Sequence, residues 1–167
     1  MQDVAADVTR LLVRELASCR REVELFPDDE SLWRTVPGVT NAAGNLVLHV
    51  CGNLRHFLGA VLGRDGYVRD REAEFGRRSG TRTELAAELD RTTAAVCAAL
   101  SGISAEALEA AYPEPVLGVT PRLGILLVHF SAHTAYHLGQ MGYLRRIVAG
   151  DTIASGALSI APLAESR

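Results

Sequence analysis

An uncharged stretch decides the fold class: residues 123–144 read LGILLVHFSAHTAYHLGQMGYL. Its length is about what a helix needs to cross a bilayer, yet three histidines, three glycines, Ser131, Thr134 and Gln140 lie within it. A helix facing lipid would carry these polar groups only at high cost. The stretch therefore predicts a buried helix of a helical bundle, and no membrane association.

Apolar residues at three- and four-residue steps predict four long helices in all. We expect them at residues 4–26, 41–63, 81–100 and 120–149. Asn41, and Thr81 or Thr83, suit the N-cap positions of the second and third helices. The pair Thr120-Pro121 is typical of an N-cap followed by the first helical residue. Because no stretch alternates as a β-strand does, the sequence predicts an all-α fold, a four-helix bundle.

A connector rich in charge and glycine, residues 64–80, separates the second and third helices. Fully extended it reaches about 55 Å, whereas a 22-residue helix is about 33 Å long. That reach allows the two helices to run parallel, although a loose loop at one end fits equally. We interpret the charged residues within it and directly after it as a solvated face: Glu72, Glu74, Arg77, Arg78, Arg82 and Glu84. The chain is expected to be a single domain, residues 1–167, with a C-terminal tail at residues 150–167.

The composition excludes several classes of function. The net charge is −3, and all 17 cationic residues are arginine. Without lysine there is no Schiff-base chemistry and no lysine of a phosphate-binding loop. With no basic stripe and only 5% aromatic residues, we expect no nucleic-acid partner. Three separated cysteines without a CxxC pair, and an N-terminus without a signal-peptide pattern, predict a cytoplasmic protein.

Three histidines of the last predicted helix carry the candidate chemistry. His129, His133 and His137 follow at four-residue spacing, so each is rotated about 40° from the one before. They share a helix face that is expected to point toward the core, together with Leu126, Gln140, Leu144 and Ile147. Each buried imidazole needs partners for two nitrogens. Histidines four residues apart can also bind one metal ion together.

The second predicted helix supplies a neutral polar strip, formed by Asn45, His49, Asn53 and His56. From its position, His49 can face His133 and His137 across the bundle. Two alternatives stay open from the residues alone: a metal pair of His129 and His133, or asparagines that cap loops and line a water-filled seam. Three histidine ligands would leave positions open on the ion, which is typical of catalytic sites. Imidazole suits Zn, Ni, Cu or Fe.

These two segments also resemble a known family. Residues 133–140, HTAYHLGQ, resemble the HxxxHxGQ signature of the DinB/YfiT-like metalloenzymes, and residues 45–50, NLVLHV, resemble the histidine motif of their second helix. The similarity covers about residues 5–149. It implies an up-down-down-up bundle with the long connector between helices two and three, and usually a homodimer.

The resemblance further implies a divalent metal, Zn, Ni or Fe, held by His49, His133 and His137. Residues expected beside these ligands are Asn45, Asn53, His129 and Gln140. His56 matches no ligand position of the family. Leu138 stands where an arginine is common in the family, which leaves the class of substrate open.

Three functions follow as hypotheses. The first, from the resemblance, is an enzyme that uses a low-molecular-weight thiol such as bacillithiol or mycothiol, and transfers it to a small electrophile or isomerises one. The second is a metal-activated hydrolase, in which bound water is the nucleophile. The third is a stress protein that binds a metal or ligand without turnover. A small molecule is the expected partner of the two enzymes.

Overall fold

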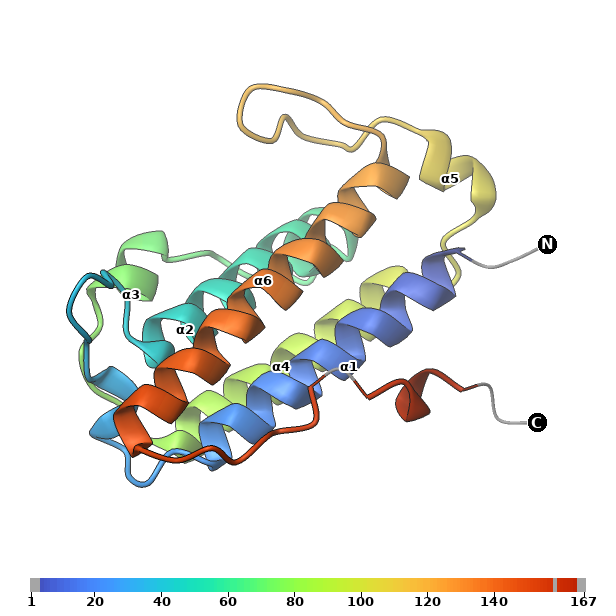
Figure 1. The fold of residues 1–167 in the computed structure, drawn as a ribbon. Helices are drawn as coiled ribbons and strands as arrows, with labels where there is room; N and C mark the ends of the chain where they lie inside the picture. The colour runs from blue at the N-terminus through green and yellow to red at the C-terminus, as the bar shows by residue number, and fades with distance from the viewer. Residues whose placement is uncertain (1–3, 158, 165–167) are drawn as a thin grey trace.

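The described residues of the computed structural model, 4–157 and 159–164, form an all-helical fold (Figure 1). Four long helices dominate it: α1 (Val4–Glu24), α2 (Ala43–Leu54) with its π-helical continuation η2 (Arg55–Leu62), α4 (Arg82–Leu100) and α6 (Leu123–Ala149). Shorter elements lie between and after them: η1 (Ser31–Trp33), α3 (Arg71–Gly76), α5 (Ala105–Glu109) and η3 (Ala161–Leu163). The described residues contain no strand, only two isolated β-bridges. The all-α prediction is confirmed.

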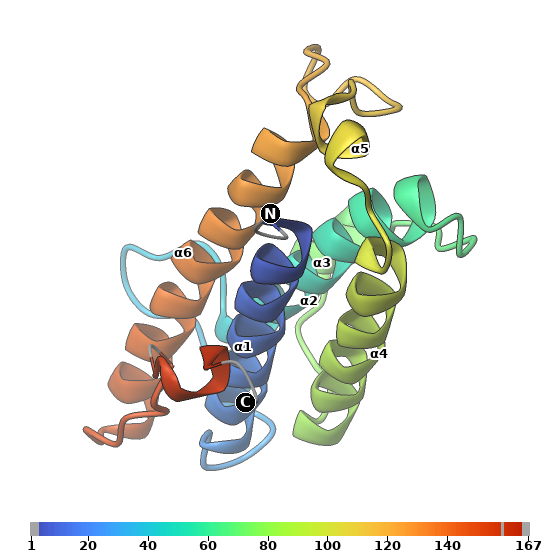
Figure 2. The same ribbon diagram turned by 90° about the vertical axis from the view of Figure 1, so that its right-hand side faces the viewer.

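The long helices pack side by side around one apolar core. Both α1 and α2 pack against α4 and α6, as the two views together show (Figures 1 and 2). Fully buried leucines from all four helices fill the centre: Leu12, Leu16, Leu54, Leu89 and Leu127. None of the described helices is at once long and apolar enough to cross a membrane, because the polar residues of α6 interrupt its apolar stretch.

The predicted N-cap of the second helix is wrong by one residue. The helix begins at Ala43, and its N-cap is Ala42 rather than Asn41. Asn45 takes over part of the capping, because its side-chain Oδ1 accepts the Ala42 N–H at 3.3 Å. Its side-chain amide donates to two carbonyl groups of the connector at 2.9 Å each, and so ties that connector to α2.

The predicted start of the last helix is also wrong. Helix α6 begins at Leu123, after the Thr120-Pro121 pair, because the Pro121 carbonyl accepts the N–H of Tyr112 at 2.8 Å. That bond flanks an isolated β-bridge between Ala111 and Arg122, which precedes the helix. By contrast, Thr81 is confirmed as the N-cap of α4, where its hydroxyl accepts the Glu84 N–H.

The connector and the tail are both more ordered than the sequence indicated. The connector contains α3, which packs against α2. Residues 150–157 and η3 run beside α1 (Figure 2), held partly by Arg21, whose Nε donates to the Ser155 carbonyl at 2.8 Å. At the end of α6, the fully buried Arg145 pairs with Glu22 at 2.6 Å and with Asp151 at 2.8 Å.

Candidate metal centre

The histidine face of α6 lies at the edge of the bundle and not in its centre. Phe130, Thr134 and Leu138 are the buried residues of this stretch, whereas His133 and His137 are half-buried and His129 is exposed. The prediction that the histidine face points into the core is therefore wrong for His129, and His133 and His137 lie at the border of the core. Ile147, expected on the same inward arc, is likewise 61% exposed.

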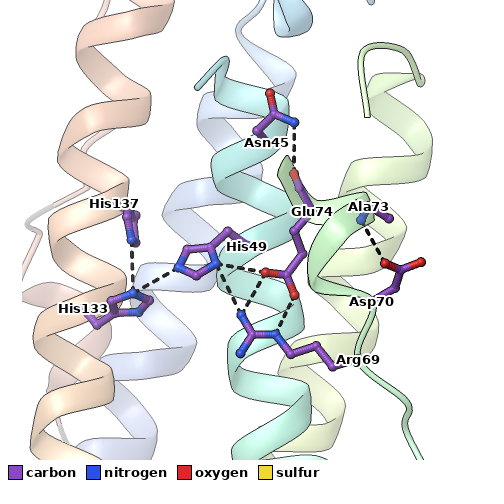
Figure 3. A network of polar contacts seen from close by, with 8 residues as sticks. All are labelled: Asn45, His49, Arg69, Asp70, Ala73, Glu74, His133 and His137. Atoms are coloured by element: carbon purple, nitrogen blue, oxygen red, sulfur yellow. Dashed lines mark hydrogen bonds and ion pairs between the residues drawn. The ribbon is translucent and has the colours of Figure 1, made fainter. Parts of the chain in front are cut away.

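Three histidines nevertheless converge, His49 from α2 and His133 and His137 from α6 (Figure 3). The Nε2 atom of His133 lies 3.3 Å from Nε2 of His49 and 3.1 Å from Nε2 of His137. One ligand atom from each ring lies within 4.8 Å of the others. Among the described residues, this is the group of histidine, cysteine and carboxylate side chains that can hold a metal ion.

In two of the three rings, the hydrogen bond made by Nδ1 shows which nitrogen carries the proton and which carries the lone pair. Nδ1 of His49 lies 3.0 Å from a carboxylate oxygen of Glu74, which can only accept, so this nitrogen carries the proton. Nδ1 of His137 lies 2.7 Å from Oε1 of Gln140 and donates in the same way. The Nε2 atoms of both rings therefore carry lone pairs, and both point at Nε2 of His133.

This arrangement suits a cation better than it suits three neutral rings. His133 can donate at most one Nε2 proton to its two neighbours, and its own Nδ1 is buried without a hydrogen-bond partner. Zinc–imidazole bonds of about 2.0–2.1 Å in a tetrahedral site place ligand nitrogens about 3.3 Å apart. The separations of the His133 Nε2 atom from Nε2 of His137 and of His49, 3.1 and 3.3 Å, match that spacing.

The electrostatic surroundings keep the cluster neutral before an ion binds. Burial, and after it the neighbouring histidines, together lower the pKa of His133 to about 4. Burial also lowers the pKa of His137, which the hydrogen bond to Gln140 only partly opposes. Imidazoles that stay neutral keep the lone pairs that a metal ion needs.

Of the other candidate residues from the sequence, some contact the three rings and some lie further along the helices. Gln140 contacts His137 directly, and the exposed His129 stacks on His133 with ring centroids 5.9 Å apart. The side-chain amide of Asn45 donates to the Glu74 carbonyl, next to the carboxylate that contacts His49. Asn53 lies one turn beyond His49 on α2, and its Oδ1 is buried without a partner.

Sequence reasoning missed two residues of the site, Glu74 and Arg69. Glu74 is only 4% exposed, so its interpretation as part of a solvated face is wrong. Burial opposes ionisation of this carboxyl, but hydrogen bonds from Arg69 and His49 outweigh burial and hold its pKa below the usual value. Nothing in the local pattern marks either residue, because both lie in the charged connector. His56, which lies against Phe57 in η2, stays outside the cluster.

A comparison with known protein families identifies the family of the chain. The model of the DinB superfamily matches residues 11–141. The chain belongs to the DinB superfamily. The matched range includes all three clustered histidines and Gln140 of this DinB-superfamily protein, and it leaves the C-terminal tail outside. No curated protein matches the chain.

Proposed function

We propose that this DinB-superfamily protein is a divalent-metal-dependent enzyme whose ion is held by His49, His133 and His137. One observation carries the proposal: three ring nitrogens converge on one point, and two of them carry lone pairs fixed by hydrogen bonds on the far side of the ring. Three protein ligands leave at least one position for a substrate or cofactor. Zn, Ni and Fe all suit such an imidazole set.

Within that proposal, the reaction is a transfer or isomerisation that uses a low-molecular-weight thiol and a small electrophile. A bound divalent ion lowers the pKa of a coordinated thiol and so supplies a thiolate nucleophile at neutral pH. Because the three ligands are neutral, the ion keeps its full charge for this task. The half-buried position of His133 and His137 leaves the site reachable from outside the bundle.

The carboxylate at the cluster favours thiol chemistry over hydrolysis. Activation of water profits from a free general base. Glu74 is the carboxylate that touches the cluster, and Arg69 holds both of its oxygens, at 2.6 and 2.8 Å, while His49 takes the remaining contact. A carboxylate committed in this way is not available to accept a proton from water.

Cobalt substitution tests the thiol hypothesis. Protein loaded with Co²⁺ is titrated with low-molecular-weight thiols and with an alcohol of matched size, and the visible and near-ultraviolet spectra are recorded. We expect a sulfur-to-cobalt charge-transfer band with a thiol only, and none with His133→Ala. A protein that binds cobalt but shows no thiol band contradicts the thiol enzyme and favours the hydrolase or the metal-binding protein without turnover.

We further propose a homodimer that uses the outer face of α6. Large apolar side chains recur along it at steps of three, eight, seven and four residues, which keep them on one helix face, and each is about half exposed or more: Ile125, Val128, Tyr136, Tyr143 and Ile147. Sedimentation of Tyr143→Glu beside the unmodified chain tests this face, and unchanged mass would contradict it.

The up-down-down-up order of helices is proposed from the same family. A cytoplasmic location is proposed because Cys19, Cys51 and Cys97 are free cysteines.

A further inference from the structure

The connector contributes an ion pair between the partly buried Arg69 and the buried Glu74 to the back of the histidine cluster. Nε and Nη2 of Arg69 donate to the two oxygens of Glu74, at 2.6 and 2.8 Å (Figure 3). One of these oxygens also accepts the Nδ1 proton of His49 at 3.0 Å. Arg69 Nη2 lies 3.4 Å from the same nitrogen, but both are donors, so the carboxylate is the partner of each.

From this geometry we infer that Glu74, held by Arg69, is the positioning residue of His49: it fixes the proton on Nδ1 and presents Nε2 to the ion. The inference rests on the proposed metal site. A carboxylate behind a metal-binding imidazole fixes the tautomer and ring orientation and makes the ring a stronger ligand. Since Arg69 balances the carboxylate charge, this support adds no net charge to the site.

The backbone of α2 is shaped for this carboxylate. A Cβ atom at Gly52 would lie 2.1 Å from Oε1 of Glu74 and 2.8 Å from its Cδ, so only glycine leaves room there. Asn45, seven residues earlier on α2, holds the Glu74 carbonyl. Contacts to the side chain and to the backbone therefore place Glu74 from two sides. An ion pair that served only to attach the connector would not require the Glu74 carboxylate to lie against the backbone of α2 at Gly52.

Two kinds of substitution separate positioning from simple anchoring. Glu74→Ala removes the acceptor, and Gly52→Ala displaces it without changing any polar group. Glu74→Gln keeps one oxygen acceptor for His49 while it loses the charge. Gly76→Ala is the matched control, since it lies in α3 two residues from Glu74 and has nothing within 4 Å of its new Cβ.

The first readout is zinc affinity, measured by competition with a chromophoric chelator, with helicity followed by circular dichroism. We expect Glu74→Ala and Gly52→Ala to bind zinc about 10- to 100-fold more weakly than the unmodified protein. Glu74→Gln should lie between them and the unmodified protein, and Gly76→Ala should match the latter. If Glu74→Ala loses its helicity, Gly52→Ala and Glu74→Gln decide the question. Unchanged affinity in the folded variants would overturn the inference.

The second readout does not need the metal. In the metal-free protein, nitrogen-15 NMR of the histidine rings should show His49 with its proton on Nδ1, and a change toward the Nε2-protonated form in Glu74→Ala. The Nδ1 form persisting in that variant would overturn the positioning role. If the unmodified protein binds no metal at all, the proposed function fails, while this tautomer measurement still decides what Glu74 does.

Discussion

Replacement of His133 by alanine removes the centre of the cluster. Its Nε2 is the atom that approaches both other rings, at 3.1 and 3.3 Å. Structural zinc sites with four ligands bind with about 10–16 kcal/mol, or about 3 kcal/mol for each ligand. Since about 1.4 kcal/mol corresponds to a factor of ten, His133→Ala should weaken zinc binding about 100-fold. The variant should keep its helicity, because His133 is half-buried at the edge of the core and its Nδ1 has no partner to lose.

The assay is competition with a chromophoric chelator at neutral pH, and the matched control is His129→Ala. His129 lies one turn away on the same helix and stacks on His133, but it is exposed and outside the three-histidine group. We expect the control to change affinity by less than about threefold, well below the cost of losing one ligand. Equal affinity in His133→Ala and the unmodified protein would refute the three-histidine assignment. A large loss in His129→Ala as well as in His133→Ala would favour the rival pair of His129 and His133.

Three further predictions concern pH, stability and partners. Burial and the neighbouring histidines lower the pKa of His133 to about 4, and burial lowers the pKa of His137, so acid should release the metal at a pH below 6.5, the pKa of free imidazole. Metal content measured from pH 8 to 4 checks this prediction. Loss of metal centred at or above pH 6.5 would contradict it. Glu22→Leu removes the carboxylate closest to the fully buried Arg145, so urea denaturation should show a free energy of unfolding that is about 3 kcal/mol lower. Glu109→Gln, in an exposed ion pair, should lower it by about 0.5 kcal/mol only. Equal losses would show that the buried pair adds nothing beyond an exposed one. With a net charge of −3, the protein should not bind duplex or single-stranded nucleic acid at physiological salt, and micromolar binding with a steep salt dependence would refute this.

The long helices were predictable because their signal is local. Apolar residues at helical spacing, together with Thr81 as a cap, place α1, α2, α4 and the end of α6 within a few residues. The inward face of α6 was harder to find, because the helix is apolar on two sides. Leu127 and Phe130 are buried, while Ile125 and Tyr136 are exposed, so the pattern alone does not say which arc meets the core.

The support behind His49 could not be predicted from local sequence. Glu74 lies in a six-residue helix within a charged segment, where a solvated carboxylate is the ordinary expectation. It is buried because of non-local contacts, namely the space at Gly52, the amide of Asn45 and the guanidinium of Arg69. The start of α6 has a similar cause, since the bond between Tyr112 and Pro121 is a tertiary feature. In both places the deciding partner is distant in the sequence.

X-ray absorption at the metal edge of the zinc-loaded protein tests whether the three histidines bind the ion. We expect one equivalent of zinc with three imidazole nitrogens at about 2.0–2.1 Å and one further light ligand, which a thiol replaces with sulfur. The imidazole signal should weaken in His133→Ala. A shell dominated by carboxylate oxygen or by protein sulfur, or no stoichiometric zinc in the folded protein, would show that His49, His133 and His137 do not form a metal centre.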